Sequence, residues 1–307
     1  VWCKGVYFIL FFHLWQIDLA QPLAPQGPFD AIVHKLSDVI VEAEHDSQSQ
    51  QLLANFETYV STHPSTVLLD PLPAMTRLLD RFASYRIMNW RICSPPYLEV
   101  HRASDLPSIQ QAVMAQGLSF PLICKTRVAH GSLSHEMSLI FSAGSLADIH
   151  PPCVLQSFVN HGAVLHKVFV VGDKHFCVER PSLKNFPSRS LWSVCTPPTD
   201  IIYLLSFALS CFTMSCCPIS LDPLSQAVDA LVRELRVQLG MALFGVDVII
   251  NIHTHTLTVI DINIFPGYEG VPQFFSSLLN HIESVLDKQT STTSSLKTTT
   301  GGPPAGL

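Results

Sequence analysis

The chain has 307 residues, which is enough for two domains or three small lobes with a large buried core. Its formal net charge of −6 gives no indication of nucleic acid or an anionic lipid surface as a partner, so we expect neither nucleic acid nor a membrane to be bound. The nine cysteines form no CxxC pair and no metal-ligand spacing, which favours a reducing, cytoplasmic location.

Residues 1–90 are predicted to form a small α/β lobe, because short strands and helices alternate along them. Strands are expected at residues 28–35 and 67–69. Helices are expected at residues 47–62, after an N-cap at Asp46 or Ser47, and at residues 75–85. The first 16 residues, VWCKGVYFILFFHLWQ, contain an apolar run of about ten residues that is typical of a signal-peptide h-region or a buried strand.

Residues 91–186 are predicted to form an antiparallel, β-rich lobe with one polar face. A helix is expected at residues 108–116, and the expected strands follow at residues 121–126, 137–141, 152–158, 164–171 and 175–179, with a loop at 180–185. Between residues 125 and 189 there are seven Lys or Arg against four Asp or Glu, and six of the 14 histidines. A surface for an anionic ligand and a chance cluster on a solvated face explain this bias equally well.

Residues 187–287 are predicted to form a third lobe, and residues 288–307 a disordered tail rich in Thr, Ser, Gly and Pro. An amphipathic helix is expected at residues 227–239, two strands at 244–251 and 257–263, and a last helix at 273–286. One stretch of this lobe, residues 201–221, carries no charge and passes as a transmembrane helix by hydropathy.

The two strands on either side of the His-Thr-His turn carry the most informative chemistry. If they form a hairpin centred on Thr254, Asp247 lies directly opposite Asp261, with their Cβ atoms about 4.5–5.5 Å apart. Asn263 then shares the face of Asp261, because side chains alternate with period two along a strand. Three oxygen-bearing side chains are therefore expected on one patch of an otherwise apolar hairpin.

Facing carboxylates are unfavourable unless a cation neutralises them. Mg²⁺ binds one or two protein carboxylates and completes its shell with water and phosphate oxygens, so this patch is suited to one or two Mg²⁺ ions that bridge ATP phosphates. An exposed hairpin face with incidental acids is the alternative, and the apolar character of the strands makes it the weaker one. The PGYEG sequence that follows Phe265 is a weak signal for backbone contact with an anion, and is more often only a turn.

Longer stretches of the sequence resemble the inositol-tetrakisphosphate 1-kinase family (inositol 1,3,4-trisphosphate 5/6-kinases). The stretches that carry the resemblance are GPFDAIVHKLSDVI, VLLDPLPA, RICSPPYLEV, ICKTRVAHGSLSHEM, PPCVLQSFVNHGAVLHKVFVVG, ERPSLKNF, LFGVDVIIN and VIDINIFPGYEGV. Together they cover about residues 18–189 and 223–286.

The resemblance implies an ATP-grasp fold of the α/β (α+β) class, with an N-terminal lobe that binds inositol phosphate and ATP between the central and C-terminal lobes. It also implies an ATP- and Mg²⁺-dependent kinase that phosphorylates inositol 1,3,4-trisphosphate at position 5 or 6 and inositol 3,4,5,6-tetrakisphosphate at position 1. A monomer is the expected state of the family.

The resemblance further implies roles for individual residues. ATP would be contacted by Arg91, Lys125, Gln156, Lys167 and Ser182, with backbone groups of residues 156–167 reading the adenine edge. The inositol phosphate would be contacted by Lys35, His135, Lys167, Asn263 and Gly267. Mg²⁺ would be held by Asp247, Asp261 and Asn263. His135 has two other readings, a proton relay or a plain structural histidine.

Three departures from the family pattern stand out. The family's opening strand and helix, with a substrate-binding lysine, are replaced by the aromatic residues 1–16. About ten helical residues are missing before Arg91, and the polar, serine-bearing stretch of the family has no counterpart between residues 189 and 221. Misread non-coding sequence explains the two odd segments best, and a genuine isoform insertion is the alternative.

A bilayer-spanning helix at residues 201–221 would place Lys125 and Lys167 on one side and Asp247 and Asp261 on the other, which is incompatible with one ATP–Mg²⁺ site. Four hypotheses follow. The chain is an active inositol polyphosphate kinase, an inactive or partial ATP-grasp fragment that binds nucleotide without turnover, another ATP-grasp enzyme such as a carboxylate–amine ligase, or a membrane protein with a kinase-like exterior.

Overall fold

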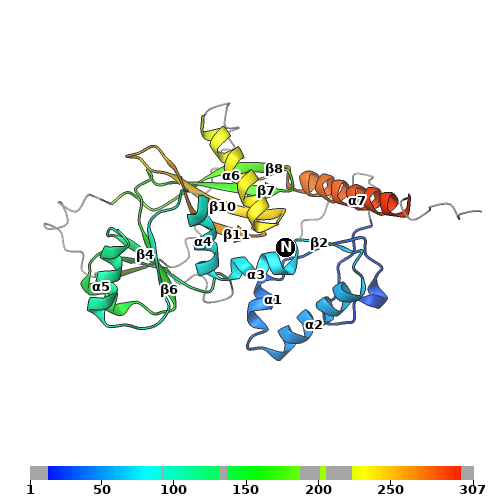
Figure 1. The fold of residues 1–307 in the computed structure, drawn as a ribbon, viewed down its shortest axis with the longest axis horizontal. Helices are drawn as coiled ribbons and strands as arrows, with labels where there is room; N and C mark the ends of the chain where they lie inside the picture. The colour runs from blue at the N-terminus through cyan, green and yellow to red at the C-terminus, as the bar shows by residue number, and fades with distance from the viewer. Residues whose placement is uncertain (1–12, 92, 131–136, 187–200, 205–222, 299–307) are drawn as a thin grey trace, which may run out of the picture.

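The computed structural model describes residues 13–91, 93–130, 137–186, 201–204 and 223–298. Figure 1 shows a lobe built from α1 and α2, a second region around β4, β6 and α5, and a third around β10, β11, β7 and β8. Most of the odd N-terminal segment and residues 205–222 lie outside the described residues.

The first sheet is antiparallel and has the strand order β3-β6-β4-β5-β9. Its strands are β3 (Tyr97–Val100), β4 (Leu122–Thr126), β5 (Met137–Ile140), β6 (Cys153–Ser157) and β9 (Ile201–Leu204). Helix α5 (Leu106–Ala115) packs on this sheet through Ile109 and Val113, and it begins after Asp105, whose carboxylate caps Ser108 N.

The second sheet has the order β11-β10-β7-β8 and is also antiparallel. Its strands are β7 (Val164–Val171), β8 (Lys174–Pro181), β10 (Leu243–Ile250) and β11 (Leu257–Ile264). Strand β7 thus pairs with β10 and β8, and neither β7 nor β8 pairs with β3 to β6, which precede them in the chain. The polypeptide therefore passes from one sheet to the other between β6 and β7.

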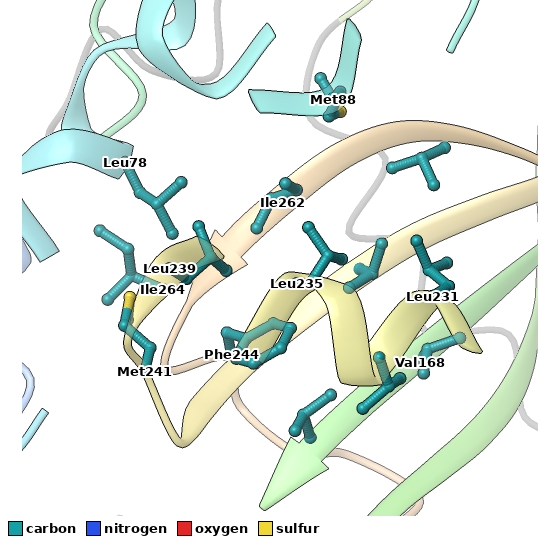
Figure 2. Packing of buried hydrophobic residues seen from close by; sticks show 14 of the residues in the cluster. Leu78, Met88, Val168, Leu231, Leu235, Leu239, Met241, Phe244, Ile262 and Ile264 are labelled. Carbon is teal, nitrogen blue, oxygen red and sulfur yellow. The ribbon is translucent and has the colours of Figure 1, made fainter. Parts of the chain in front are cut away.

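One face of the second sheet is buried by three helices, α3 (Leu72–Leu79), α4 (Arg81–Arg91) and α6 (Pro223–Leu239). Figure 2 shows Leu231, Leu235 and Leu239 of α6 against the strands, at the four-residue spacing that places them on one side of a helix. Phe244 and Ile262 from the strands complete this layer. Because this face is filled by apolar side chains, polar side chains of the sheet lie on its opposite face.

The opposite face is covered at one end by α7 (Phe274–Thr298) and by the chain that leads into it. The covered end contains Phe169, Leu243, Tyr268 and Ile282. Lys167 lies two residues from Phe169 along β7, so its side chain is on the same face of the sheet, nearer the other end of the strand. Asp247 is paired with Lys167 across β7 and β10 and lies on that face too.

The N-terminal lobe holds a two-stranded parallel sheet of β1 (Ala31–Val33) and β2 (Val67–Leu69) beside α1 (Ser37–Glu42), α2 (Ser47–Thr62) and the short helix η1 (Ala24–Gln26). Asp70, directly after β2, joins this lobe to the second sheet: its buried carboxylate accepts hydrogen bonds from Ala242 N and Leu243 N, both at 2.8 Å. Burial raises the pKa of Asp70, and the two N–H donors oppose the increase.

Two predicted elements differ in the structure. The helix expected at residues 75–85 is two helices, α3 and α4, separated at Asp80, which has extended backbone. The tail expected to be disordered from residue 288 continues α7 as helix to residue 298. Gln289 Nε2 donates to Ser65 O at 2.6 Å, which joins the first part of this segment to the N-terminal lobe. Residues 299–307 lie outside the described part of the chain.

Of the apolar stretch at residues 201–221, the structure describes residues 201–204. Its first four residues form β9, which pairs antiparallel with β5. Across the residues that the structure describes, none of the helices has the length and apolar character needed to cross a membrane.

The packing of α6 on the second sheet gives a direct test. Leu235 is fully buried (0% exposed), and Val237 on the same helix is 83% exposed. We expect Leu235→Ala to lower the free energy of unfolding by about 2–5 kcal/mol, because a cavity remains in the core, as measured by urea denaturation. Val237→Ala is the matched control, and an equal loss in both variants would contradict the assigned packing.

Candidate active site

Asp247 and Asp261 lie opposite each other on neighbouring strands, as predicted from the sequence. The pairing near the turn is shifted by one residue, however: Val248 pairs with Val259, so Ile260 has no partner across the hairpin. This β-bulge shifts the pairing by one residue, so that Asp247 is opposite Asp261. The carboxylates therefore face each other because of the bulge, and not because the hairpin is centred on Thr254.

The bulge also creates a contact for Lys125 of β4. The Lys125 ammonium donates to Ile260 O at 3.0 Å and lies 3.9 Å from Asp261 Oδ2. Its side chain is only 5% exposed, and its Nζ lies 5.4 Å from the centre of the Tyr85 ring. A buried ammonium is thus brought from the first sheet to the carboxylates of the second.

A second lysine reaches the same face from β7. Lys167 pairs with Asp247 across β7 and β10, and its Nζ lies 3.6 Å from Asp247 Oδ1. The side chain of Lys167 is 36% exposed, so it keeps access to solvent. Each carboxylate of the facing pair therefore has its own ammonium partner.

The charges of this cluster are strongly coupled. Burial raises the pKa of Asp247, and the neighbouring Asp261 carboxylate adds to the increase, while Lys167 and Lys125 oppose it. Burial lowers the pKa of Lys125, but Tyr85 and Asp261 raise it, and the net result is a pKa above the ordinary lysine value. The ammonium groups of Lys167 and Lys125 thus oppose protonation of the Asp247 carboxylate.

The donor set fits a hard divalent cation. Asp247 and Asp261 keep 16% and 23% of their side chains exposed, so their oxygens remain accessible from the open side of the sheet. Among the described residues no cluster of three or more His, Cys, Asp or Glu side chains can hold a metal. Two carboxylates and the Asn263 amide oxygen match Mg²⁺, which takes few protein ligands and completes its shell with water and phosphate.

The glycine-containing loop after β11 closes one side of this face. Asn263 pairs with Gly245, where an added Cβ would come within 3.0 Å of Pro266 Cγ, so the absence of a side chain lets the loop turn over the strands. Tyr268 has a φ of +52°, its ring is buried, and its hydroxyl donates to Val170 O at 2.8 Å. Gly267, directly before it, is exposed.

The two other predicted nucleotide contacts have partners within the protein. Gln156 is buried on β6, which is paired on both sides with β3 and β4, and its side-chain oxygen accepts the Tyr85 hydroxyl. Ser182 Oγ lies 2.8 Å from His161 Nε2.

Lys35 follows β1 in the N-terminal lobe and is exposed. Its charge acts on His130, a histidine in the loop after β4 that lies 3.8 Å from Asp38 Oδ1. Burial lowers the pKa of His130; Asp38 opposes the decrease and Lys35 adds to it. The N-terminal lobe therefore meets this loop with a mixture of cationic and acidic side chains.

Sequence reasoning missed Arg81, the buried residue that begins α4. Its guanidinium donates to Thr126 O at 2.7 Å and to Val128 O at 2.9 Å, and Arg127 forms two hydrogen bonds with Asp80 at 3.1 and 2.6 Å. Asp80 and Arg81, at the break between α3 and α4, thus hold the segment that follows Lys125 by hydrogen bonds. An Asp-Arg pair between two apolar helical runs was the available signal.

Two predicted site residues lie outside the part that the structure describes. These are His135 and the side chain of Arg91, whose backbone ends α4. Their assignments remain predictions.

The cavity of about 610 Å³ beside β2, α6 and Val285 is lined by Arg233 and Arg236 but by neither member of the carboxylate pair, so it is not the candidate site.

Comparison with solved structures defines the fold. D-alanyl-alanine synthetase A from Vibrio cholerae superimposes with a TM-score of 0.51 at 12% identity, over 77% of this chain and 71% of that chain. D-alanine–D-alanine ligase from Bacillus anthracis gives a TM-score of 0.50 at 14% identity, over 76% and 77%. At such identities the likeness shows the fold alone.

Comparison of sequences defines the family. The inositol 1,3,4-trisphosphate 5/6-kinase ATP-grasp domain matches residues 87–284, and the pre-ATP-grasp domain of the same kinases matches residues 11–75. Inositol-tetrakisphosphate 1-kinase of Xenopus laevis is 46% identical over 89% of this chain and 72% of its own length, and the protein of that name from Danio rerio has the same values.

The two sheets and the match to an ATP-grasp domain identify the chain as an ATP-grasp protein. Within that class, the chain belongs to the inositol 1,3,4-trisphosphate 5/6-kinase family. The family and the ATP-grasp fold expected from the sequence are therefore confirmed, and the ligase-type relatives share only the fold.

The anchoring of the glycine-containing loop is open to test. We expect Tyr268→Phe to lower the free energy of unfolding by about 1 kcal/mol in urea denaturation, because it removes the buried hydrogen bond to Val170 O. Tyr97→Phe is the control, since the Tyr97 hydroxyl makes no hydrogen bond within the described residues. A Tyr268→Phe protein as stable as the control would show that the hydroxyl does not hold the loop.

Proposed function

We propose that the protein is an ATP- and Mg²⁺-dependent kinase that transfers the γ-phosphoryl group of ATP to hydroxyl groups of inositol polyphosphates. The observation that carries the proposal is the facing pair of Asp247 and Asp261 with an ammonium group beside each. The inositol-tetrakisphosphate 1-kinases to which the chain is similar support the acceptor class. We propose inositol 1,3,4-trisphosphate, at position 5 or 6, and inositol 3,4,5,6-tetrakisphosphate, at position 1, as substrates.

The metal would be held by Asp247, Asp261 and Asn263. When bound, Mg²⁺ neutralises negative charge on the phosphate oxygens during transfer. The protein itself supplies position and charge. Lys125 is a buried ammonium whose position is fixed by Ile260 O, so it meets a phosphate without reorganising. Lys167 is more exposed and is placed to contact phosphate on either the nucleotide or the inositol.

The nucleotide is proposed to lie between the two sheets, against the backbone of residues 156–167, with Ser182 and Arg91 as further contacts. The inositol phosphate is proposed to lie between this site and the N-terminal lobe, where Lys35, His135, Lys167, Asn263 and Gly267 contact its phosphates. We further propose a cytoplasmic monomer that binds neither nucleic acid nor a membrane.

The kinase assignment is tested by Asp261→Asn. We expect a loss of at least about 100-fold in the rate of inositol phosphate phosphorylation with Mg-ATP, because one of two metal carboxylates is removed, as measured by chromatography of the products. Asp229→Asn is the matched control, since its side chain is 48% exposed and lies on α6, away from the carboxylates.

Two results would count against the assignment. If the wild-type protein binds Mg-ATP and phosphorylates no inositol phosphate of a panel, the chain is a nucleotide-binding fragment without turnover. If Asp261→Asn keeps full activity, the facing carboxylates are not the metal site.

The acceptor site is tested separately with Lys35→Ala. We expect the KM for the inositol phosphate to rise about tenfold, because one charged contact to phosphate is lost, while the KM for ATP stays within about twofold of the wild-type value. Lys174→Ala, which removes an exposed lysine at the start of β8, outside both the N-terminal lobe and the segment that follows β8, is the comparison. A rise in the KM for ATP instead would place Lys35 at the nucleotide.

A further inference from the structure

The connection between β6 and β7 is short and structurally constrained. Residues 158–163 carry the chain from the first sheet to the second, along the segment against which the nucleotide is proposed to lie. Gly162 and Ala163 have φ values of +68° and +62°, and the second of these is a conformation that an alanine rarely adopts. Such a connection needs neighbouring groups to hold its shape.

The segment that follows β8 supplies those groups. Asn160 Nδ2 donates to Phe186 O at 2.8 Å, and Phe186 N donates back to Asn160 Oδ1 at 2.9 Å. Ser182 N donates to Ala163 O at 2.8 Å. The Phe186 ring lies edge-on to Phe158, with ring centres 4.9 Å apart. Residues 182–186 therefore contact the connection at both of its ends, through hydrogen bonds and through the ring contact.

Asn185 holds the centre of the connection. Its side-chain oxygen accepts two consecutive backbone N–H groups, from His161 at 3.0 Å and from Gly162 at 2.9 Å. This acceptor lies at the residues that turn into the positive-φ conformation. One side chain thus satisfies both donors that the turn leaves free.

The side chain of His161 is hydrogen bonded to Ser182. The His161 ring is buried, and its Nδ1 lies 2.7 Å from Val159 O, an oxygen that can only accept. Nδ1 therefore donates to this oxygen, and Nε2 of the neutral ring is left to accept the Ser182 hydroxyl at 2.8 Å. The position of Ser182 Oγ is consequently set by the same connection that Asn185 fixes.

We propose that Asn185 is a positioning residue for the nucleotide: it holds residues 161–163, and through His161 the Ser182 hydroxyl, in the conformation that binds ATP. This inference rests on the proposed function, because it takes the nucleotide to lie along residues 156–167 and at Ser182. A connection ordered before binding costs the complex less entropy than one ordered by the ligand, so the effect appears in nucleotide affinity.

The test compares two substitutions at one position. Asn185→Ala removes the acceptor of both N–H groups, and we expect the Kd for Mg-ATP, measured by isothermal titration calorimetry, to rise about tenfold. Asn185→Asp keeps an oxygen in the same place, and we expect a Kd within about twofold of wild type. The KM for the inositol phosphate is expected to stay unchanged in both variants. Asn185 is exposed and lies outside both cores, so the substitutions leave the packed layers intact.

Gln110→Ala is the matched control. Gln110 likewise joins its side chain to a distant segment, by donating to Ala143 O at 2.9 Å, but it is half-buried and lies on α5. We expect it to bind Mg-ATP like the wild type. Equal Kd values for Asn185→Ala and the wild type, or an equal rise in the Kd for ATP and the KM for inositol phosphate, would overturn the inference. If the wild-type protein binds Mg-ATP but phosphorylates none of the inositol phosphates, the proposed function is wrong, and the role of Asn185 in nucleotide binding is still decided by the Kd values.

Discussion

The structure depends on one electrostatic constraint: two carboxylates face each other within an apolar β-hairpin. Asp247 and Asp261 would repel each other and resist burial if they had no cationic partners. Lys167 lies on the strand next to Asp247, and Lys125 reaches Asp261 from the other sheet. Because the two ammonium groups come from different sheets, the balance of charge requires the sheets to meet at this point.

Several irregular features place Lys125 at that meeting point. The β-bulge at Ile260 turns a backbone oxygen toward the ammonium, and the break between α3 and α4 allows Arg81 to hold the chain that leaves β4. A regular hairpin and a continuous helix would offer neither contact. Asp70 adds a third fixed point, since its carboxylate joins the N-terminal lobe to the start of β10. The irregular positions thus lie where the lobes are joined, around a regular core.

Much of the fold followed from short-range patterns in the sequence. The period-two alternation predicted that Asp261 and Asn263 share a face, and the family motifs predicted the ATP-grasp fold. The bulge at Ile260 and the pairing of β7 with β10 could not be predicted, because both depend on contacts between segments far apart in the chain. The tail was predicted from composition alone, which gives no sign of the hydrogen bond from Gln289 to Ser65 of the N-terminal lobe. The role of Asn185 depends on backbone groups and leaves no side-chain motif.

The central claim is that the facing carboxylates bind the metal of an Mg-ATP site. The most direct measurement is the affinity for ATP as a function of Mg²⁺ concentration, by calorimetry, for the wild-type protein and for Asp247→Asn. We expect Mg²⁺ to strengthen ATP binding to the wild-type protein by at least about tenfold and the variant to lose most of this dependence. ATP binding that does not change with Mg²⁺, or a dependence that is the same in both proteins, would contradict it.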